Sequence, residues 1–422
     1  MRKHTGTGHA GMRTRSKRAQ ERDPWGEPPW TARFVPRRRA LPERVDFAII
    51  GGGFSGLSAA VHLKKMAPGK SVLVLEAGLL GNGASGRTGG MALDETAAGK
   101  LPGLGKVLSG YRKILRDLKL RLSKDEAGFP GVWEIGRGGA APALDSQAKH
   151  LQFKKHSAIH WNDSGDLRIV RKLPGGSVDP KKIVAELARA AESAGAQFVE
   201  NAEVRGVKFG DPIELRIQLN RSGSKRAMTI QAAQVLFATN AGGLNFSGMP
   251  QAAQAKVTFA LATASLKRAE IAALGLADSK SFYTVDLPYL WGRIFDGNRI
   301  IFGSGLVPAY GEAVKNSERE KKKLWGGLEK IDVRRGDAAS RLEALEKRVR
   351  GFHPALESVK ITHRWGGPIL ITEDWHPVFR HHPKTKRAIV LGGFSGHGVA
   401  LAVYLGRRAA QALLGKRKLP KW

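Results

Sequence analysis

The stretch VDFAIIGGGFSGLSAAVHLKKM, residues 45–66, decides the fold that this sequence predicts. Its first six residues are an apolar run that predicts a buried strand, and its alanine-rich part from Ser55 to Met66 predicts a helix. A second apolar run, residues 71–75, predicts another buried strand. A strand, a helix and a strand within about 30 residues form the βαβ unit of a parallel sheet, so the predicted fold class is α/β.

Glycines fill the turn between this strand and this helix in the pattern G-x-G-x-x-G. Gly51 allows the tight turn, Gly53 lets the backbone approach a pyrophosphate, and Gly56 lets the helix pack closely on the strand. Phe54 and Ser55 lie at the start of the helix, where unpaired N–H groups attract phosphates. Alone, this pattern is a weak indication of a dinucleotide site.

A carboxylate and a second glycine-rich segment strengthen the indication. Glu76 ends the second strand 20 residues after Gly56, where it can accept the hydroxyl groups of an adenosine ribose, which favours FAD or NAD over NADP. The loop GASGRTGG, residues 83–90, follows, and its small residues together with Arg87 suit a diphosphate and an isoalloxazine edge. A nicotinamide enzyme has no need of this loop, so FAD is favoured. A glycine turn with an unrelated glutamate and a plain surface loop are the alternatives.

Length and composition limit the class of protein. The 422 residues, with a mass of 45.6 kDa, predict two compact units. The absence of cysteine excludes disulfides, thiolate metal ligands, cysteine nucleophiles and a cysteinyl link to a cofactor. No cluster of histidines and carboxylates has the spacing of a metal site, so none is expected. The sequence has no run of eighteen apolar residues and no signal-peptide core, so we expect a cytoplasmic protein without a membrane span.

The net charge of +33 is unusually high. Residues 1–44 hold 12 basic and 4 acidic residues, so most of the excess lies on the folded body. We interpret this segment as a basic tail that runs into an extended arm, with Trp25 and Trp30 packed on the body; a targeting peptide is the alternative. The charge is compatible with a solvated basic surface, a nucleic acid, an acidic membrane surface or an acidic ligand, and it selects none of them.

The motifs together resemble one family. The sequence is similar to the FAD-dependent oxidoreductases that include D-amino acid oxidase, glycine oxidase and gamma-glutamylputrescine oxidase, and most of all to the last branch. Seven segments spread over the chain carry the resemblance. They are IIGGGFSGLSAAVHL (49–63), VLEA (74–77), GASGRTGG (83–90), VDPKKIVAELARAAESAGAQFVENAEV (178–204), VLFATNAGG (235–243), RWGG (364–367) and LGGFSGHGVA (391–400).

The resemblance implies a discontinuous, Rossmann-type FAD-binding domain and a second, α+β substrate domain whose antiparallel sheet roofs the flavin. Independently, residues 257–306 alternate in the manner of an antiparallel sheet, with a turn at Asp296 and Gly297. The predicted FAD-binding domain consists of residues 45–100, 155–245 and 360–416. The predicted substrate domain consists of residues 101–154 and 246–359.

The resemblance also implies which residues hold the cofactor, and it implies noncovalent FAD. The backbone of Val204 would touch the adenine, and the turn from Gly393 to Gly398 would lie under the flavin ring with N–H groups near its pyrimidine oxygen. The full predicted set is Gly51, Gly53, Phe54, Ser55, Gly56, Glu76, Ala77, Ala84, Ser85, Arg87, Thr88, Gly89, Gly90, Val204, Asn240, Ala241, Gly242, Trp365, Gly366, Gly393, Phe394, Ser395, Gly396, His397 and Gly398.

The activity that the resemblance implies is oxidation of the C–N bond of an amine or amino acid by hydride transfer to flavin N5. The imine product would hydrolyse to an aldehyde or keto acid and an amine or ammonia, and oxygen or another acceptor would reoxidise the cofactor. A tRNA-associated oxidoreductase that uses the basic surface is the alternative. The catalytic candidates are Tyr283, Trp291 and Arg293, with Tyr289 beside them and Arg293 as the carboxylate anchor, and His397 as a turn residue packed by the flavin. An ordinary core or sheet-surface role is the alternative for each.

Two positions depart from the pattern of the sarcosine-oxidising relatives. Those relatives carry a lysine two residues after the C-terminal glycine turn, where this chain has Ala400, and another on the roof strand, where it has Ile301. Both differences count against a sarcosine-type pocket. The second also leaves reactivity with oxygen open.

Overall fold

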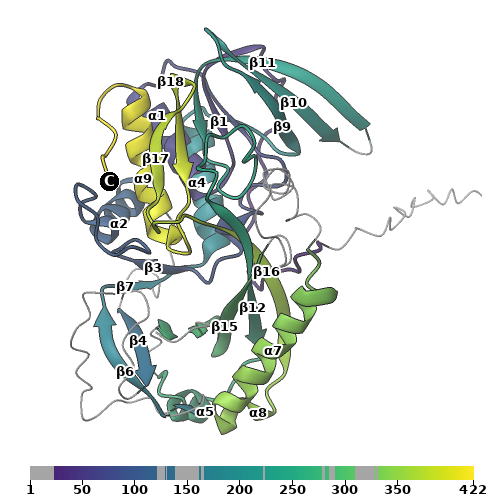
Figure 1. Cartoon of the computed structure of the whole chain (residues 1–422), viewed down its shortest axis with the longest axis vertical. Coiled ribbons are helices and arrows are strands. Elements are labelled where there is room, and N and C mark those ends of the chain that lie inside the picture. The colour runs from purple at the N-terminus through teal and green to yellow at the C-terminus, as the bar shows by residue number, and fades with distance from the viewer. Residues whose placement is uncertain are drawn as a thin grey trace, which may run out of the picture.

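A computed structural model describes residues 23–120, 129, 131–137, 161–162, 166–221, 224–277, 281–284, 290–308, 328 and 331–422. Their strands form two large sheets, one in the upper and one in the lower half of Figure 1. The predicted fold class, α/β with a second antiparallel sheet, is confirmed. Residues 1–22 of the predicted tail and arm (1–44) and the candidate Tyr289 lie outside the described residues.

The first sheet contains the predicted βαβ unit. Its order is β17-β18-β11-β1-β2-β8. In addition, β10 pairs with β11, and β9 pairs with β10. The central strand β1 is parallel to β11 and to β2, with Ile50 opposite Phe237 and Leu75. The strands are β1 (Arg44–Ile50), β2 (Val72–Leu75), β8 (Gln197–Val199), β9 (Ala202–Lys208), β10 (Ile213–Arg221), β11 (Ser224–Phe237), β17 (Val378–His382) and β18 (Thr385–Gly392).

Four helices pack on one face of this sheet or on one another there. They are α1 (Phe54–Met66), α2 (Val107–Asp117), α4 (Pro180–Ser193) and α9 (Gly398–Leu413). α1 is buried from Phe54 to Lys64 because it packs against both α9 and α4. A Cβ atom at Gly406 would lie 2.5 Å from the carbonyl oxygen of Ser55, so only a glycine allows α9 to lie this close to α1.

The second sheet has the order β16-β12-β15-β14-β13-β4-β6-β5 and is antiparallel except where β13 pairs with β4. The predicted turn after β14 is confirmed, since Asp296 and Gly297 have φ angles of +35° and +64°. The strands are β4 (Val132–Arg137), β5 (Trp161–Asn162), β6 (Asp166–Leu173), β12 (Gln254–Thr263), β13 (Ser281–Thr284), β14 (Leu290–Phe295), β15 (Arg299–Pro308) and β16 (Ile361–Ile371).

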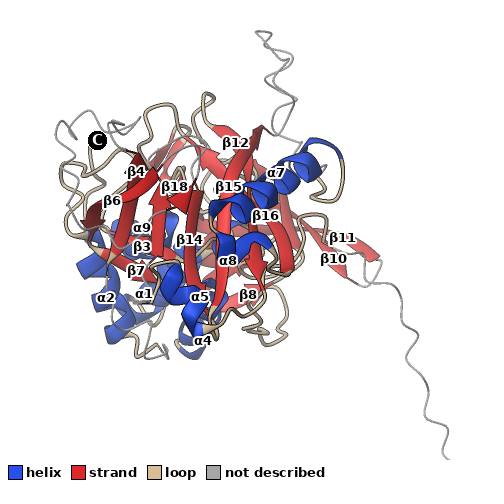
Figure 2. Cartoon of the chain, turned by 90° about the horizontal axis from the view of Figure 1, so that it is seen from below, coloured by secondary structure: helices blue, strands red, loops and turns tan. Residues whose placement is uncertain are grey.

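The two faces of the second sheet differ. One face packs on α5 (Arg268–Ala273), α7 (Gly336–Phe352) and α8 (Pro354–Glu357), and Figure 2 shows α7 and α8 lying across β15 and β16. Phe259, Phe282 and Phe302 are fully buried in that core. The opposite face, called the roof face below, is turned toward the first sheet.

The sheets divide the chain differently from the predicted domains at three points. β16 lies in the range predicted for the FAD-binding domain but pairs with β12 of the second sheet. β5 and β6 also lie in that range, yet β6 pairs with β4. α2 lies in the predicted substrate domain but packs on α9. In each case a contact between segments that are far apart in the sequence decides which sheet the element joins or covers. The small sheet of β3 (Met91–Leu93) and β7 (Gly175–Ser177) lies where the chain crosses between layers.

An extended segment, residues 23–43 and called the arm below, precedes β1. The prediction that its two tryptophans pack on the body is confirmed. Trp30 is 6% exposed and meets Trp365 edge-to-face, with 5.8 Å between the ring centroids. The indole N–H of Trp25 donates to the carbonyl of Leu328 at 3.1 Å. Among the helices within the described ranges, none is both long and apolar enough to cross a membrane.

His62 makes the stability of the fold depend on pH. Burial in α1 lowers the pKa of His62 from 6.5 to about 4. The unfolded chain therefore takes up a proton as the pH falls through 6.5, whereas the folded chain does so only near pH 4, and stability is lost in between. Between pH 7 and 4.5 we expect the wild type to lose roughly 2 kcal/mol more than His62→Gln. Urea unfolding of both proteins at the two pH values measures the difference; equal losses would contradict the prediction.

Candidate functional site

The glycine turn between β1 and α1 is as tight as its sequence predicts. Gly51 has a φ angle of +110°, and a Cβ atom there would lie 2.5 Å from the carbonyl oxygen of Ala238. At Gly56 a Cβ atom would lie 2.0 Å from the carbonyl oxygen of Gly51. Gly53 has no side chain with which to cap α1, and the amide of Phe54 instead donates to Ser85 Oγ at 2.9 Å. The turn and the loop 83–90 are therefore in direct contact.

Glu76 follows β2 and lies beside this turn, as predicted. Its two carboxylate oxygens accept the amide N–H groups of Gly52 at 2.7 Å and Gly78 at 2.9 Å. Burial raises the pKa of Glu76, although these two bonds act in the opposite direction. A carboxylate oxygen can accept more than one hydrogen bond, so Glu76 can still accept the hydroxyls of a ribose. Val204, the predicted adenine neighbour, is buried on β9 in the same apolar cluster as Leu75.

The end of β11 supplies a polar group that the sequence reasoning missed. Thr239 Oγ1 is buried and has no hydrogen-bond partner among the described residues. Its amide nitrogen lies 3.3 Å from where a Cβ atom of Gly51 would be. A hydroxyl orphaned at a glycine turn fits a site that receives a polar ligand. The adjacent Asn240 has a φ angle of +47°, and its Oδ1 accepts the amide of Gly393 at 3.0 Å.

Asn240 thereby joins β11 to the C-terminal glycine turn. Gly393, Ser395 and Gly396 of this turn have φ angles of +66°, +47° and +90°. α9 begins directly after it, and its N-cap residue His397 makes no side-chain capping bond. Burial lowers the pKa of His397, which keeps its imidazole neutral. β1 and β18 both run parallel to β11, so α1 and α9 start at the same edge of the sheet, where ligands bind in open α/β folds.

Loop 83–90 lies between the two sheets, and side-chain donors from outside it bind three of its carbonyl oxygens. The indole N–H of Trp30 donates to Gly86 at 2.7 Å, and that of Trp365 donates to Arg87 at 2.9 Å. Arg293 Nε donates to the carbonyl of Gly89 at 2.6 Å. The arm, β16 and β14 therefore each hold one peptide of the loop.

The guanidinium of Arg87 bonds to protein groups. It is 4% exposed, forms an ion pair with Asp23, and donates to the carbonyls of Asn82 at 2.9 Å, Gly26 at 2.7 Å and Gly366 at 3.2 Å. Burial lowers its pKa, and the charge of Asp23 acts against that shift. The sequence predicted that Arg87 contacts a diphosphate. These contacts instead point its guanidinium at the arm, because burial requires a partner for every donor.

On the roof face, one row of mutually opposite residues crosses six strands. Trp291 is opposite Tyr283 and Gly303, and the row continues through both of them. The indole of Trp291 covers the loop, because a Cβ atom at Gly89 would lie 2.3 Å from its ring. Trp291 therefore contacts loop 83–90, and Tyr283 lies next to it on the same face. The row consists of Glu134, Tyr283, Trp291, Gly303, Ala260 and Trp365.

Arg293 follows on the same face, and its guanidinium bonds to backbone carbonyls. It is 6% exposed, and besides Gly89 it donates to the carbonyl of Val178 at 3.0 Å. Its guanidinium carbon lies 5.5 Å from the ring centroid of Trp30. These contacts tie β14 to the loop. The role of carboxylate anchor stays a prediction, and the observed partners favour a positioning role.

Glu134 was missed from the sequence. It is 4% exposed on the roof face, and the hydroxyl of Tyr283 lies 3.4 Å from its Oε1. The signal was present, because strand alternation places Glu134 on the same side as the buried Val132. Ile301, opposite Arg293, is fully buried, and Ala400 is buried in α9. Within the described ranges no group of three His, Asp or Glu side chains could hold a metal ion.

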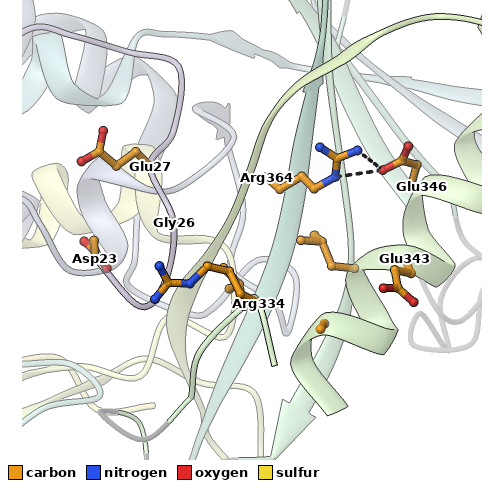
Figure 3. Close-up of a pocket in the computed structure, with 10 residues that line it drawn as sticks. Asp23, Gly26, Glu27, Arg334, Glu343, Glu346 and Arg364 are labelled. Carbon is orange, nitrogen blue, oxygen red and sulfur yellow. Dashed lines mark hydrogen bonds and ion pairs between the residues drawn. The ribbon is translucent and has the colours of Figure 1, made fainter. Parts of the chain in front are cut away.

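A cavity of about 610 Å³ lies beside the arm and contains none of the predicted site residues. In Figure 3, Asp23 and Glu27 of the arm lie on one side of it, and Glu343 and Glu346 of α7 lie on the other. Arg364 of β16 reaches Glu346 Oε2 at 2.5 Å. Asp23 therefore connects this cavity with Arg87.

Comparison with known proteins agrees with this geometry. Residues 46–412 match the family model described as DAO, FAD dependent oxidoreductase. The chain is 26% identical to a probable oxidoreductase OrdL of Rhizobium meliloti, over 92% of this chain and 88% of the relative. It is 26% identical to gamma-glutamylputrescine oxidoreductase of Escherichia coli, over 88% and 84%. Glycine oxidase of Geobacillus kaustophilus has a similar fold, with a TM-score of 0.64, 19% identity, and coverage of 89% and 96%.

The glycine turn gives a direct test of the cofactor site. Gly56→Ala forces a Cβ atom against the Gly51 carbonyl, so α1 must move, and overpacking of this kind costs roughly 1–3 kcal/mol. We expect the dissociation constant of FAD to rise about tenfold or more. Titration of the apoprotein with FAD measures it. Gly69→Ala is the matched control, since a Cβ atom there meets nothing within 4 Å; equal affinities of the two variants would contradict the prediction.

Proposed function

The chain belongs to the DAO family of FAD-dependent oxidoreductases, and from this premise we propose that it oxidises the C–N bond of an amine or amino acid. The names of two relatives, gamma-glutamylputrescine oxidoreductase and glycine oxidase, support this substrate class. The imine product would hydrolyse to an aldehyde or keto acid and an amine or ammonia.

One observation carries the proposal: the roof face, with its buried carboxylate and aromatic side chains, lies directly over loop 83–90. When bound, FAD supplies an acceptor for a hydride from the carbon next to the substrate nitrogen. Glu76, the starts of α1 and α9, and Thr239 are the groups that would hold it. The chain's own task is then to position an amine between the loop and the roof, and to exclude water.

Glu134 and Tyr283 are the polar residues that we assign to the substrate amine. A buried carboxylate attracts an ammonium group, and the Tyr283 hydroxyl beside it adds a donor and an acceptor. Trp291 would supply an apolar wall next to them. Burial lowers the pKa of the half-buried His397 and so disfavours the charged form that would repel a cationic substrate. Arg293 holds the roof strand on the loop and acts as a positioning residue.

The electron acceptor follows from neither the fold nor the family. Ile301 and Ala400 replace the lysines of the sarcosine-oxidising relatives, and both side chains are buried and apolar. We therefore propose an amine or amino acid other than sarcosine. Oxygen and a quinone or dye are the two acceptors to compare.

An absorption spectrum tests the proposal most directly. We expect the purified protein to show flavin bands that pass into the supernatant after acid precipitation, because FAD is bound noncovalently. Anaerobic addition of amines, amino acids and gamma-glutamyl amines should bleach the bands with one substrate class. Hydrogen peroxide on exposure to air would identify an oxidase, and reduction of an added dye a dehydrogenase. A panel in which no C–N compound bleaches the flavin would overturn the proposed function while leaving the cofactor intact.

The substrate side of the site can be tested by substitution. Glu134→Gln keeps the shape of the side chain but removes the charge, so we expect the KM for a cationic amine to rise roughly tenfold or more, with a smaller change for an uncharged analogue. Steady-state kinetics with both substrates measures the ratio. Glu357→Gln, at an exposed position on α8, is the control. A KM that rises equally for both substrates would count against recognition of a cation by Glu134.

A further inference from the structure

We propose that the arm is part of the cofactor site, and that Asp23 and Trp30 are positioning residues that hold loop 83–90 in the conformation that receives FAD. The proposal concerns the cofactor that the family uses, and it does not depend on which amine is oxidised. It rests on the contacts of the arm with the loop on one side and with the roof on the other.

The loop needs an external support because of its own composition. Four of its eight residues are glycines, and glycine loses more backbone entropy on ordering than any other residue. Its side chains are small, apart from Arg87, so the loop has little with which to pack. A loop of this kind binds a cofactor tightly only if other parts of the chain order it beforehand.

Trp30 provides the first support. Its indole N–H donates to the carbonyl of Gly86 at 2.7 Å. Its ring packs edge-to-face against Trp365 and Phe295, with centroid distances of 5.8 and 5.9 Å. The guanidinium of Arg293 covers the same ring at 5.5 Å and bonds to Gly89 of the loop. Trp30 thus fixes Gly86 directly and supports the residue that fixes Gly89.

Asp23 provides the second support. Its carboxylate pairs with the buried guanidinium of Arg87, the one long side chain of the loop, and Arg87 also donates to the carbonyl of Gly26. The ring of Trp25 lies 5.4 Å from the same guanidinium. A buried arginine that loses its carboxylate keeps its charge and must find another partner, so the loop would shift.

The arm can act in this way because the second sheet holds it. The amide of Gly366 donates to the carbonyl of Trp25 at 2.7 Å, and the amide of Val333 donates to that of Pro24 at 2.8 Å. Gly26 has a φ angle of +68°, and a Cβ atom there would lie 2.3 Å from the carbonyl of Arg364. The arm therefore links the roof sheet to the loop rather than resting on one of them.

Two conservative variants in the full-length protein test the proposal. Trp30→Phe keeps an aromatic ring but removes the indole N–H that bonds to Gly86. Asp23→Asn keeps the shape of the side chain but removes the charge that pairs with Arg87. Titration of each apoprotein with FAD, followed by flavin fluorescence, should show a dissociation constant raised roughly tenfold, as expected for a lost hydrogen bond to a charged or buried group. The absorption bands of the bound flavin should also shift, because its surroundings relax.

Matched controls lie on the same arm. Phe34→Leu removes an edge-to-face contact with Phe198 rather than a contact with the loop, and Glu43→Gln removes a charge from an exposed carboxylate. Both should leave the FAD affinity within about twofold of the wild type. Thermal unfolding of each apoprotein separates general instability from the proposed effect. Test variants with lowered melting temperatures but unchanged FAD affinity and spectra would overturn the proposal, as would controls that weaken FAD binding equally.

Discussion

The carbonyl oxygens of Gly86, Arg87 and Gly89 are removed from water where the two sheets meet, and each needs a donor there. The chain satisfies them with Trp30, Trp365 and Arg293, which come from the arm and from two strands of the second sheet. In return, the guanidinium of Arg87 donates hydrogen bonds from the loop to carbonyls of the arm and of β16. Because each partner would be costly to bury alone, the two sheets, the loop and the arm keep one relative arrangement.

This junction separates the tasks of the two sheets. The first sheet supplies groups suited to a dinucleotide: two helix starts, the carboxylate of Glu76 and the hydroxyl of Thr239. The second sheet contributes a continuous row of residues, which includes Glu134, Tyr283 and Trp291, the residues proposed to meet a substrate. On the proposed function the chemistry occurs at the boundary, so errors in the packing of the junction would affect the binding of cofactor and substrate together.

The parts of this arrangement that depend on local sequence could be predicted. The glycine turn, the position of Glu76 and the hairpin at Asp296 follow from the backbone freedom of a few residues and from apolar periodicity. The parts that depend on pairing between distant segments could not. β16 shows no local sign that it joins the second sheet, and nothing near Arg87 indicates that Asp23 is its partner. Arg293 was expected to anchor a substrate carboxylate because a guanidinium binds carboxylates well, and its bonds to the carbonyls of Gly89 and Val178 could not be foreseen from the sequence.

The separation of the arm from its partners along the sequence has a consequence for biosynthesis. The arm is synthesised before the strand that holds it, β16, which follows more than 300 residues later, and the turn at Gly393 is made later still. Contacts over such sequence separations form late and slowly. A nascent chain can therefore assemble the βαβ unit early but cannot complete the junction until β16 has been made. Ordering of the loop is thus coupled to synthesis of β16, and a chain terminated before that strand would lack the junction.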